Sequence, residues 1–129
     1  MFPAPLLSAL SFAAAAFMAL SLFVSAPHTG NLLASPWDKV AHLGFFGGIT
    51  LLLAIGFGRR YILLAFIVAV ATGIADESYQ AFLPTRHADW GDLLTDIAAA
   101  ACAALLARHF LAGASPEPPI AGIDDPESE

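Results

Sequence analysis

The residues best able to do chemistry in this sequence stand in pairs at helical spacing. Asp38 and His42 are four residues apart, and Asp92 and Asp96 repeat that spacing. Residues three or four apart lie on one face of a helix. Each pair can therefore present a carboxylate and a second polar group to the same neighbour.

A third pair, Glu77 and Gln80, is three residues apart, and Arg86 follows it closely. A buried carboxylate suits general acid or base chemistry, so the candidates for catalysis are Glu77, His42 and Asp92. An arginine can hold a phosphate or carboxylate through its planar guanidinium. The sequence contains no serine-centred elbow, phosphate-cradling loop or cofactor fingerprint, and we expect no cofactor.

The pattern also predicts no metal ion. Six carboxylates and two histidines are expected near one face, but no His-Glu-x-x-His motif is present and the histidines lie on different segments. Cys102 is the single cysteine. It is expected to be a small buried hydrophobic residue rather than a reactive thiol.

The chain of 129 residues is too apolar for an ordinary soluble domain. Only 12% of its residues are charged, whereas about a quarter are charged in soluble domains. Five of its eleven acids lie in residues 112–129, so the preceding body is nearly neutral despite the net charge of −6. This composition excludes a cytosolic globule, a disordered regulator and a nucleic-acid-binding protein, which would need a basic patch.

Four apolar segments are each long enough to cross a bilayer, which takes about 20 apolar residues. The predicted helices cover residues 4–26, 40–57, 61–82 and 92–111. We therefore predict an all-α polytopic membrane protein, built as a four-transmembrane-helix bundle. The first segment is expected to remain as a helix rather than to be cleaved as a signal peptide, because no Lys or Arg precedes it.

The predicted organisation is one membrane domain over residues 1–111 followed by an acidic tail over residues 112–129. The tail contains four prolines among its acids and is expected to be disordered. In the membrane domain, positive charges predict the orientation. Arg59, Arg60 and Arg108 fall on one side, against Lys39 and Arg86 on the other, which predicts that both termini are cytoplasmic.

This topology places every acid that precedes the tail on the outer side of the membrane. Ionisable groups at such depth usually face the bundle interior and pair with one another. Because neighbouring carboxylates repel, one of Asp92 and Asp96 is expected to be protonated or paired with Lys39 or Arg86. The predicted polar cluster, a pocket open to the outer leaflet, consists of Asp38, Lys39, His42, Glu77, Gln80, Arg86, Asp92 and Asp96.

Several of these residues also have structural interpretations. Glu77 would form an ion pair with Arg86 or Lys39, and Arg86 would clamp Glu77 or Asp92. His42 would form a hydrogen bond to Asp38 or to a carboxylate across the bundle. Asp89 is expected to cap the last helix.

Small residues are expected to allow close helix approach. They form the segment Gly44-Phe-Phe-Gly47-Gly48, and they continue the polar stripes at Gly73, Ala99 and Ala103.

The polar residues occur in a recognisable order. Asp38-Lys39-x-x-His42 opens one helix, Glu77-x-x-Gln80-x-Phe82 closes the next, and Pro84-x-Arg86 and Asp92 follow. Over residues 36–111 this order resembles the VanZ-like family of small bacterial integral membrane proteins, the teicoplanin-resistance protein VanZ family. The resemblance implies a four-helix protein of the bacterial plasma membrane, linked through its namesake to resistance against teicoplanin-type glycopeptides. Asp96 departs from the common Asn, and Ala99 departs from a frequent Gly.

Three functions remain open at this point. The favoured one is a non-enzymatic cell-envelope protein, in contact with membrane lipids, whose pocket binds a lipid-linked or peptidoglycan-related ligand. The second is a structural or accessory membrane subunit in which the charges only lock the bundle. The third is a membrane-embedded acid/base enzyme acting on a lipid-linked substrate.

Overall fold

The computed structural model describes residues 4–29, 36–84 and 86–112. Its long helices are α1 (Ala4–Thr29), α2 (Trp37–Phe57), α3 (Ile62–Gln80) and α4 (Trp90–Ala112), and a short 3-10 turn, η1 (Arg59–Tyr61), precedes α3. No strand occurs in these ranges. All four long helices, with η1 joined to α3, are long and apolar enough to cross a membrane. The all-α, four-span prediction is thus confirmed.

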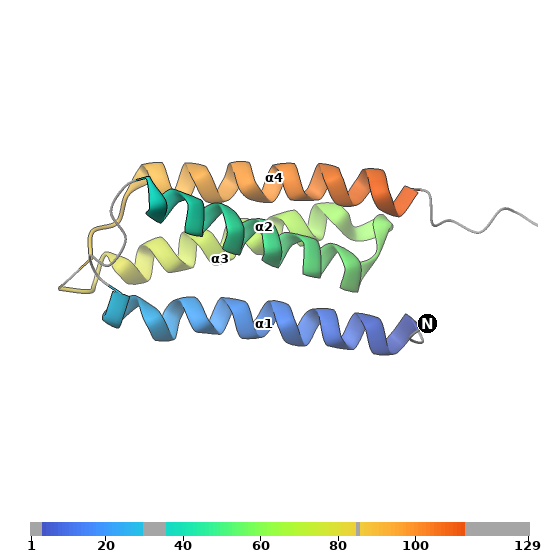
Figure 1. The fold of residues 1–129 in the computed structure, drawn as a ribbon, viewed down its shortest axis with the longest axis horizontal. Coiled ribbons are helices and arrows are strands. Elements are labelled where there is room, and N and C mark those ends of the chain that lie inside the picture. The colour runs from blue at the N-terminus through green and yellow to red at the C-terminus, as the bar shows by residue number, and fades with distance from the viewer. Residues whose placement is uncertain (1–3, 30–35, 85, 113–129) are drawn as a thin grey trace, which may run out of the picture.

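The four helices run up and down beside one another (Figure 1). Helix α2 contacts each of the other three helices, α4 packs against α2 and α3, and α1 packs mainly against α2. The starts of α2 and α4 meet the end of α3 at one end of the bundle, which we call the polar end. The opposite end, which we call the arginine end, holds η1 and the end of α4.

The helix boundaries lie within three residues of those expected, and α3 shows why they shift. It ends at Gln80 rather than Phe82, because the chain turns there through hydrogen bonds from Phe82 N–H to the Tyr79 carbonyl and from Leu83 N–H to the Gln80 carbonyl. Pro84 follows, and a proline disfavours helical geometry in the residue before it. The predicted disordered tail lies, apart from Ala112, outside the described residues.

The joint between α2 and η1 depends on one glycine. Gly58 has φ of 78°, a conformation that side chains with a Cβ rarely adopt. Its N–H donates to the Ala54 carbonyl at 2.9 Å, and its own carbonyl accepts from Tyr61 N–H at 3.0 Å. This turn reverses the chain within a few residues.

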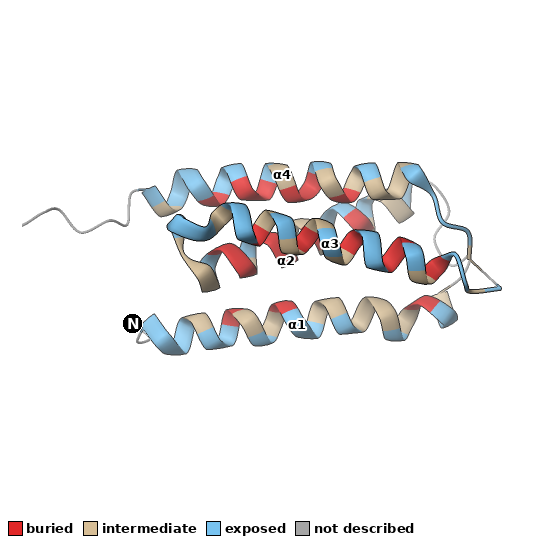
Figure 2. Ribbon diagram, turned by 180° about the vertical axis from the view of Figure 1, so that it is seen from behind, coloured by how far each residue is buried: buried red, intermediate tan, exposed pale blue. Residues whose placement is uncertain are grey.

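The bundle core is built largely of small side chains. On α3, Ala65 and Ala69 are fully buried, and on α4 the predicted stripe of Ala99 and Ala103 is 3% and 4% exposed. Figure 2 shows that the buried positions of α2, α3 and α4 face one another. Large apolar side chains instead cover the outside, as expected where lipid rather than water surrounds a bundle; they include Phe17, Leu63, Leu105 and Phe110.

The expectation about Cys102 was wrong, and the expected close approach at Gly44-Phe-Phe-Gly47-Gly48 is found only at Gly48, where an added Cβ would lie 3.1 Å from Met18. A Cβ added at Gly44 or Gly47 would meet no described atom within 4 Å, whereas one at Gly56 would lie 2.6 Å from the Phe12 ring. The close approach of α1 to α2 is therefore at Gly56, with a looser contact between Gly48 and Met18. Cys102 is exposed, because the inward face of α4 is taken by the alanine stripe and Cys102 points away from it.

Candidate functional site

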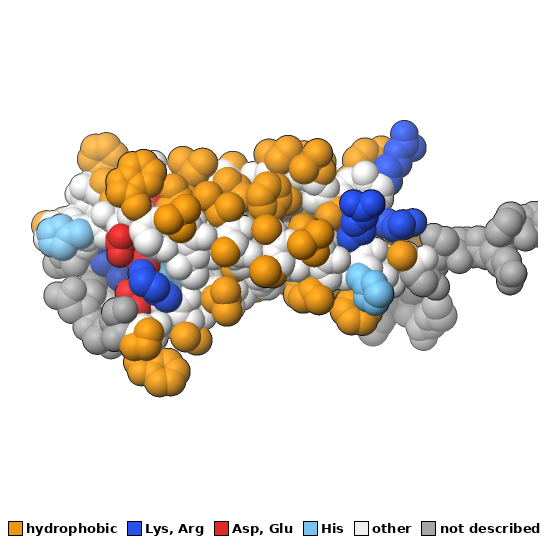
Figure 3. Space-filling view, turned by 90° about the horizontal axis from the view of Figure 1, so that it is seen from above, with side chains coloured by type: hydrophobic (Ala, Val, Ile, Leu, Met, Phe, Trp, Pro, Cys, Tyr) orange, Lys and Arg blue, Asp and Glu red, His pale blue; other side chains and the backbone are white. Residues whose placement is uncertain are grey.

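The polar end brings together all eight residues of the predicted cluster. Asp38, Lys39 and His42 come from the first turns of α2, and Asp92 and Asp96 come from those of α4. The remaining three come from the last turn of α3 and the joint after it, namely Glu77, Gln80 and Arg86. Figure 3 shows acidic and basic side chains gathered at this end, and a separate basic group at the other.

His42 connects α2 to α4 through a buried hydrogen bond. Its Nδ1 lies 2.9 Å from Oδ1 of Asp96, whose side chain is fully buried. Its ring stacks on Phe46, and its Nε2 lies 4.0 Å from Oδ2 of Asp92. Of the two partners expected for His42, the structure selects the carboxylate across the bundle rather than Asp38.

Lys39 makes a second connection between α2 and α4. Its ammonium Nζ donates to Oδ1 of Asp92 at 2.7 Å and lies 3.6 Å from Oδ2 of Asp89. We expected one of Asp92 and Asp96 to be protonated or to pair with Lys39 or Arg86. In the structure, Asp92 pairs with Lys39. The Asp38 carboxylate instead accepts a hydrogen bond from the backbone N–H of the adjacent residue, Lys39, at 2.8 Å.

Glu77 has a different partner from the one expected. Its Oε2 accepts a hydrogen bond from the backbone N–H of Asp89 at 2.9 Å. Within the described residues, neither Lys39 nor Arg86 lies within 4.0 Å of its carboxylate, and Arg86 forms no ion pair with Asp92. The expected Arg86 clamp is therefore not formed, and Glu77 instead ties the end of α3 to the residue preceding α4.

Asp89 caps α4 as expected. Its Oδ1 accepts from Gly91 N–H at 2.8 Å, and its carbonyl accepts from Leu93 N–H at 3.2 Å. An N-terminal cap of this kind satisfies a backbone donor that the helix leaves free. The Gly91 hydrogen bond, with the nearby Lys39 charge, holds the pKa of Asp89 below its usual value of 3.8.

Asp76 is a site residue that the predicted cluster omitted. Its side chain is 1% exposed, and its Oδ2 accepts from Nε2 of Gln80 at 2.7 Å. The spacing of four residues between Asp76 and Gln80 was the available signal. Asp76 also lines a cavity of about 140 Å³ between α1, α2 and the end of α3, together with Asp38, His42 and Arg86.

Several buried polar atoms at this end have no hydrogen-bond partner among the described residues. They are Oδ1 of Asp76, Oε1 of Glu77, Oδ2 of Asp96 and Nε of Arg86. Native proteins leave few buried polar atoms unpaired, so each one points to a partner that the described residues do not supply.

A larger cavity of about 430 Å³ opens between the end of α3 and the start of α4. Its walls are mainly apolar, with Ile74, Trp90 and Leu93 contributing large side chains. Glu77 and Asp89 are its acidic residues. The cavity therefore combines an apolar surface with a carboxylate whose Oε1 is unpaired.

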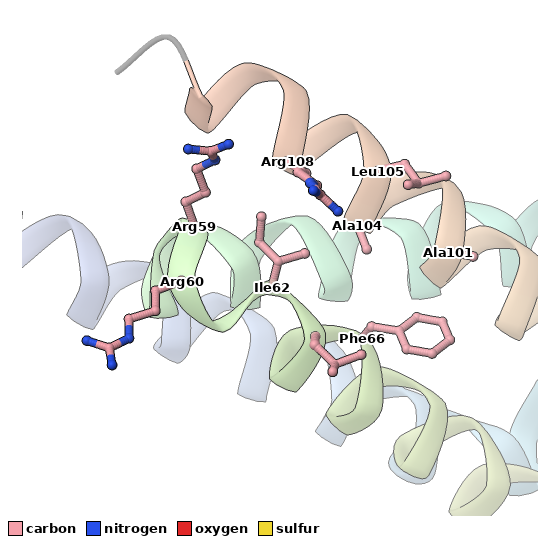
Figure 4. Close-up of a pocket in the computed structure, with 9 residues that line it drawn as sticks. Arg59, Arg60, Ile62, Phe66, Ala101, Ala104, Leu105 and Arg108 are labelled. Atoms are coloured by element: carbon pink, nitrogen blue, oxygen red, sulfur yellow. The ribbon is translucent and has the colours of Figure 1, made fainter. Parts of the chain in front are cut away.

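The arginine end is opposite in charge. A groove of about 800 Å³ between α3 and α4 is lined by Arg59, Arg60 and Arg108, with an apolar wall that includes Phe66 and Leu105 (Figure 4). Every Asp and Glu among the described residues lies at or beside the polar end. The bundle is thus acidic at one end and basic at the other.

Three ligand-bearing residues also converge at the polar end. One imidazole nitrogen of His42, one oxygen of Glu77 and one oxygen of Asp96 all lie within 4.8 Å of one another, and all three residues are buried. Neither the missing His-Glu-x-x-His motif nor the separation of the histidines along the sequence excludes this arrangement, because one histidine meets carboxylates from two other helices.

Comparisons with known proteins extend beyond the residues that carried the resemblance. A family model described as VanZ/LLP1 matches residues 5–112, which includes α1 as well as the three helices with the polar motifs. No curated protein and no solved structure matches the chain. Because the family match spans four apolar helices and most of the sequence, this chain belongs to the VanZ/LLP1 family and is a four-helix membrane protein.

Proposed function

We propose that this protein binds a lipid-linked or peptidoglycan-related molecule of the bacterial cell envelope at its polar end. One observation carries the proposal. Glu77 is 7% exposed, its Oε1 has no partner among the described residues, and it lies on the wall of the mainly apolar 430 Å³ cavity.

The chemistry of this cavity favours an amphipathic ligand. Ile74, Trp90 and Leu93 offer apolar contact to an acyl or polyprenyl chain. An ionised carboxylate can only accept hydrogen bonds, so Glu77 would receive one from a hydroxyl, amide or amine of the ligand head. Binding sites of this type combine an apolar wall with a few polar groups that orient the ligand.

The charges favour a location at the outer leaflet of the bacterial plasma membrane. Short cytoplasmic joints carry an excess of Lys and Arg, and the arginine end holds Arg59, Arg60 and Arg108. With that end inside, both chain termini are cytoplasmic and the polar end faces outward. Trp37 and Trp90, which are 65% and 81% exposed, would then lie at the outer interface, where tryptophan is enriched.

A peptidoglycan-related ligand is the form of this proposal that would connect the protein with resistance to teicoplanin-type glycopeptides. Such a ligand would present sugar hydroxyls and amides to Glu77 and a lipid chain to the apolar wall. The protein would then contribute to resistance by changing how much of that molecule is available in the outer leaflet.

The structural alternative has an observation of its own. The Lys39–Asp92 and His42–Asp96 contacts both join α2 to α4, and they would serve an accessory subunit whose charges only hold the bundle together. Glu77 Oε1 takes no part in either contact. A locking role therefore accounts for these four residues, and the hydrogen bond from Asp89 N–H to Glu77 Oε2 fits it too. It leaves the unpaired Oε1 of Glu77 and the apolar cavity unexplained.

Native mass spectrometry of the full-length protein extracted in mild detergent tests the proposal. Wild type is compared with Glu77→Gln, which is similar in size, and with Leu93→Trp, which fills the cavity. Leu106→Trp, at an exposed position of α4, is the control. We expect a lipid or envelope precursor bound to wild type and to Leu106→Trp, and lost from most molecules of the other two variants. Identical spectra for all four proteins would overturn the proposal.

A further inference from the structure

The buried charges at the polar end do not balance. Asp76, Glu77 and Asp96 are each at most 7% exposed, and within the described residues no Lys or Arg lies within 4.0 Å of their carboxylates. Lys39 is committed to Asp92 and Asp89. An ionised carboxylate is costly to bury unless it is paired or coordinates a metal. The site therefore needs protons or a further cation.

We propose that His42, Glu77 and Asp96 bind one divalent metal ion between α2, α3 and α4. Their ligand atoms lie within 4.8 Å of one another. Two oxygens of this trio, Oε1 of Glu77 and Oδ2 of Asp96, are buried without a partner among the described residues. The arrangement is thus more than a group of acids, because it pairs an imidazole with two nine-tenths buried carboxylates, each of which has one unpaired oxygen.

The distances suit an ion with short bonds to nitrogen and oxygen. Ligands about 2.1 Å from an ion are about 3.0 Å apart in octahedral geometry and about 3.4 Å apart in tetrahedral geometry. The 2.9 Å between His42 Nδ1 and Asp96 Oδ1 is close to such an edge. The Glu77 oxygen lies within 4.8 Å of both atoms and would move closer to this edge when the ion binds.

The donor set restricts the kind of ion. Imidazole suits zinc and the later first-row metals, whereas carboxylates also suit manganese, magnesium and calcium. One imidazole with two carboxylates therefore favours Zn²⁺ or Mn²⁺. Three protein ligands leave at least one coordination position open.

Neighbouring groups support the trio. On the other side of the ring, Oδ2 of Asp92 lies 4.0 Å from His42 Nε2. This is beyond hydrogen-bond distance, but it places a carboxylate near the nitrogen to which outer partners of metal-bound histidines commonly bond. A Cβ at Gly73 would lie 3.1 Å from Asp96 Oδ2. The absence of a side chain there gives this oxygen its space.

Metal loading of the full-length protein tests the site. The protein is purified without a polyhistidine tag, stripped with EDTA, exposed to Zn²⁺ or Mn²⁺ and washed. The bound metal is then measured by elemental mass spectrometry. We expect about one ion per wild-type chain, and at least ten-fold weaker binding in Glu77→Gln and Asp96→Asn. Asp38→Asn is the matched control, because Asp38 is acidic, lies at the same end and stands outside the trio. No binding to wild type, or an equal loss in Asp38→Asn, would overturn the proposal.

A measurement on wild type keeps the test valid if a variant fails to fold. Pulsed electron paramagnetic resonance of the Mn²⁺-loaded protein should show coupling to an imidazole nitrogen, and its absence would contradict ligation by His42.

The metal site does not rest on the proposed lipid ligand, although both use Glu77. Leu93→Trp separates them: it should retain the metal and lose the lipid. Metal binding by a wild-type protein that holds no lipid would support the metal site and overturn only the proposed function.

Discussion

Nδ1 of His42 lies 2.9 Å from Oδ1 of Asp96, and this contact joins the first turns of α2 and α4, although the two residues are 54 positions apart in the sequence. The carboxylate is fully buried, and its second oxygen has no partner among the described residues. The contact therefore has two parts: a hydrogen bond that holds two helices together, and an unsatisfied oxygen that remains available for a ligand.

The first prediction concerns the energy of this contact. Removing one partner of a buried hydrogen bond leaves the other unsatisfied, at a cost of about 1–3 kcal/mol. We expect Asp96→Ala and His42→Ala each to lower the free energy of unfolding by about that amount, and the double variant to lose much less than the sum. Unfolding in mixed micelles measures all four proteins.

A further variant, Asp96→Asn, tests whether the hydrogen bond itself causes the loss of stability. The amide oxygen of asparagine can still accept a hydrogen bond from the imidazole. We expect Asp96→Asn to be more stable than Asp96→Ala while it loses metal binding. If Asn and Ala variants lost the same stability, the hydrogen bond would not be the source of the effect.

The second prediction concerns the contact of α1 with α2. An alanine at Gly56 would place its Cβ 2.6 Å from the Phe12 ring, which itself packs edge-on against Phe57. Overpacking of this kind typically costs about 1–3 kcal/mol, so Gly56→Ala should lower thermal stability in detergent. Gly44→Ala should leave stability unchanged or slightly raised, since a Cβ there meets no described atom within 4 Å and alanine favours helix. Equal losses in both variants would show that Gly56 has no special packing role.

The third prediction concerns pH and the cap of α4. Asp89 has a pKa below its usual 3.8 in the folded protein, mainly because its carboxylate accepts a hydrogen bond from Gly91 N–H. A lowered folded pKa means that the stabilisation is complete above the unfolded value and is lost as the pH falls through the folded value. Asp89→Ala should therefore be less stable than wild type at pH 7, and the difference should shrink below about pH 3.8.

Asp89→Asn provides the control for that experiment. Asparagine caps helices about as well as aspartate, so this variant should retain most of the stability at pH 7 and show less dependence on pH than wild type. Thermal unfolding of the three proteins between pH 3 and pH 7 makes the comparison. A stability difference between wild type and Asp89→Ala that does not change over this range would contradict the assignment.

The fourth prediction concerns orientation. In a Cys102→Ala background, a cysteine at exposed Ala88 of the polar end should react with a membrane-impermeant maleimide added to intact cells. A cysteine at exposed Ala112, at the end of α4, should react only after the membrane is permeabilised. The excess of arginine at one end is the physical basis of this expectation, and the reverse labelling pattern would place the polar end in the cytoplasm.

The sequence alone predicted the four spans, with each boundary within three residues of the observed one. Four runs of apolar residues, each about as long as the membrane is thick, favoured four helices, and alternation of direction placed the acids of the body at a common end. Local signals of this kind depend on residues close in the chain. The cap at Asp89 and the small inward stripe of Ala99 and Ala103 were predictable for the same reason.

Only the tertiary structure decided which groups meet inside the bundle. Periodicity gives the face on which a side chain lies but not the neighbour that this face contacts. Periodicity also contains no information about backbone donors. The hydrogen bond from Asp89 N–H to Glu77 could therefore not be anticipated, and an ion pair between Glu77 and Arg86 was expected instead. The meeting of His42, Glu77 and Asp96 required three helices to pack at a particular rotation and depth. That packing involves contacts between residues far apart in the chain, such as Gly73 of α3 against Asp96 of α4.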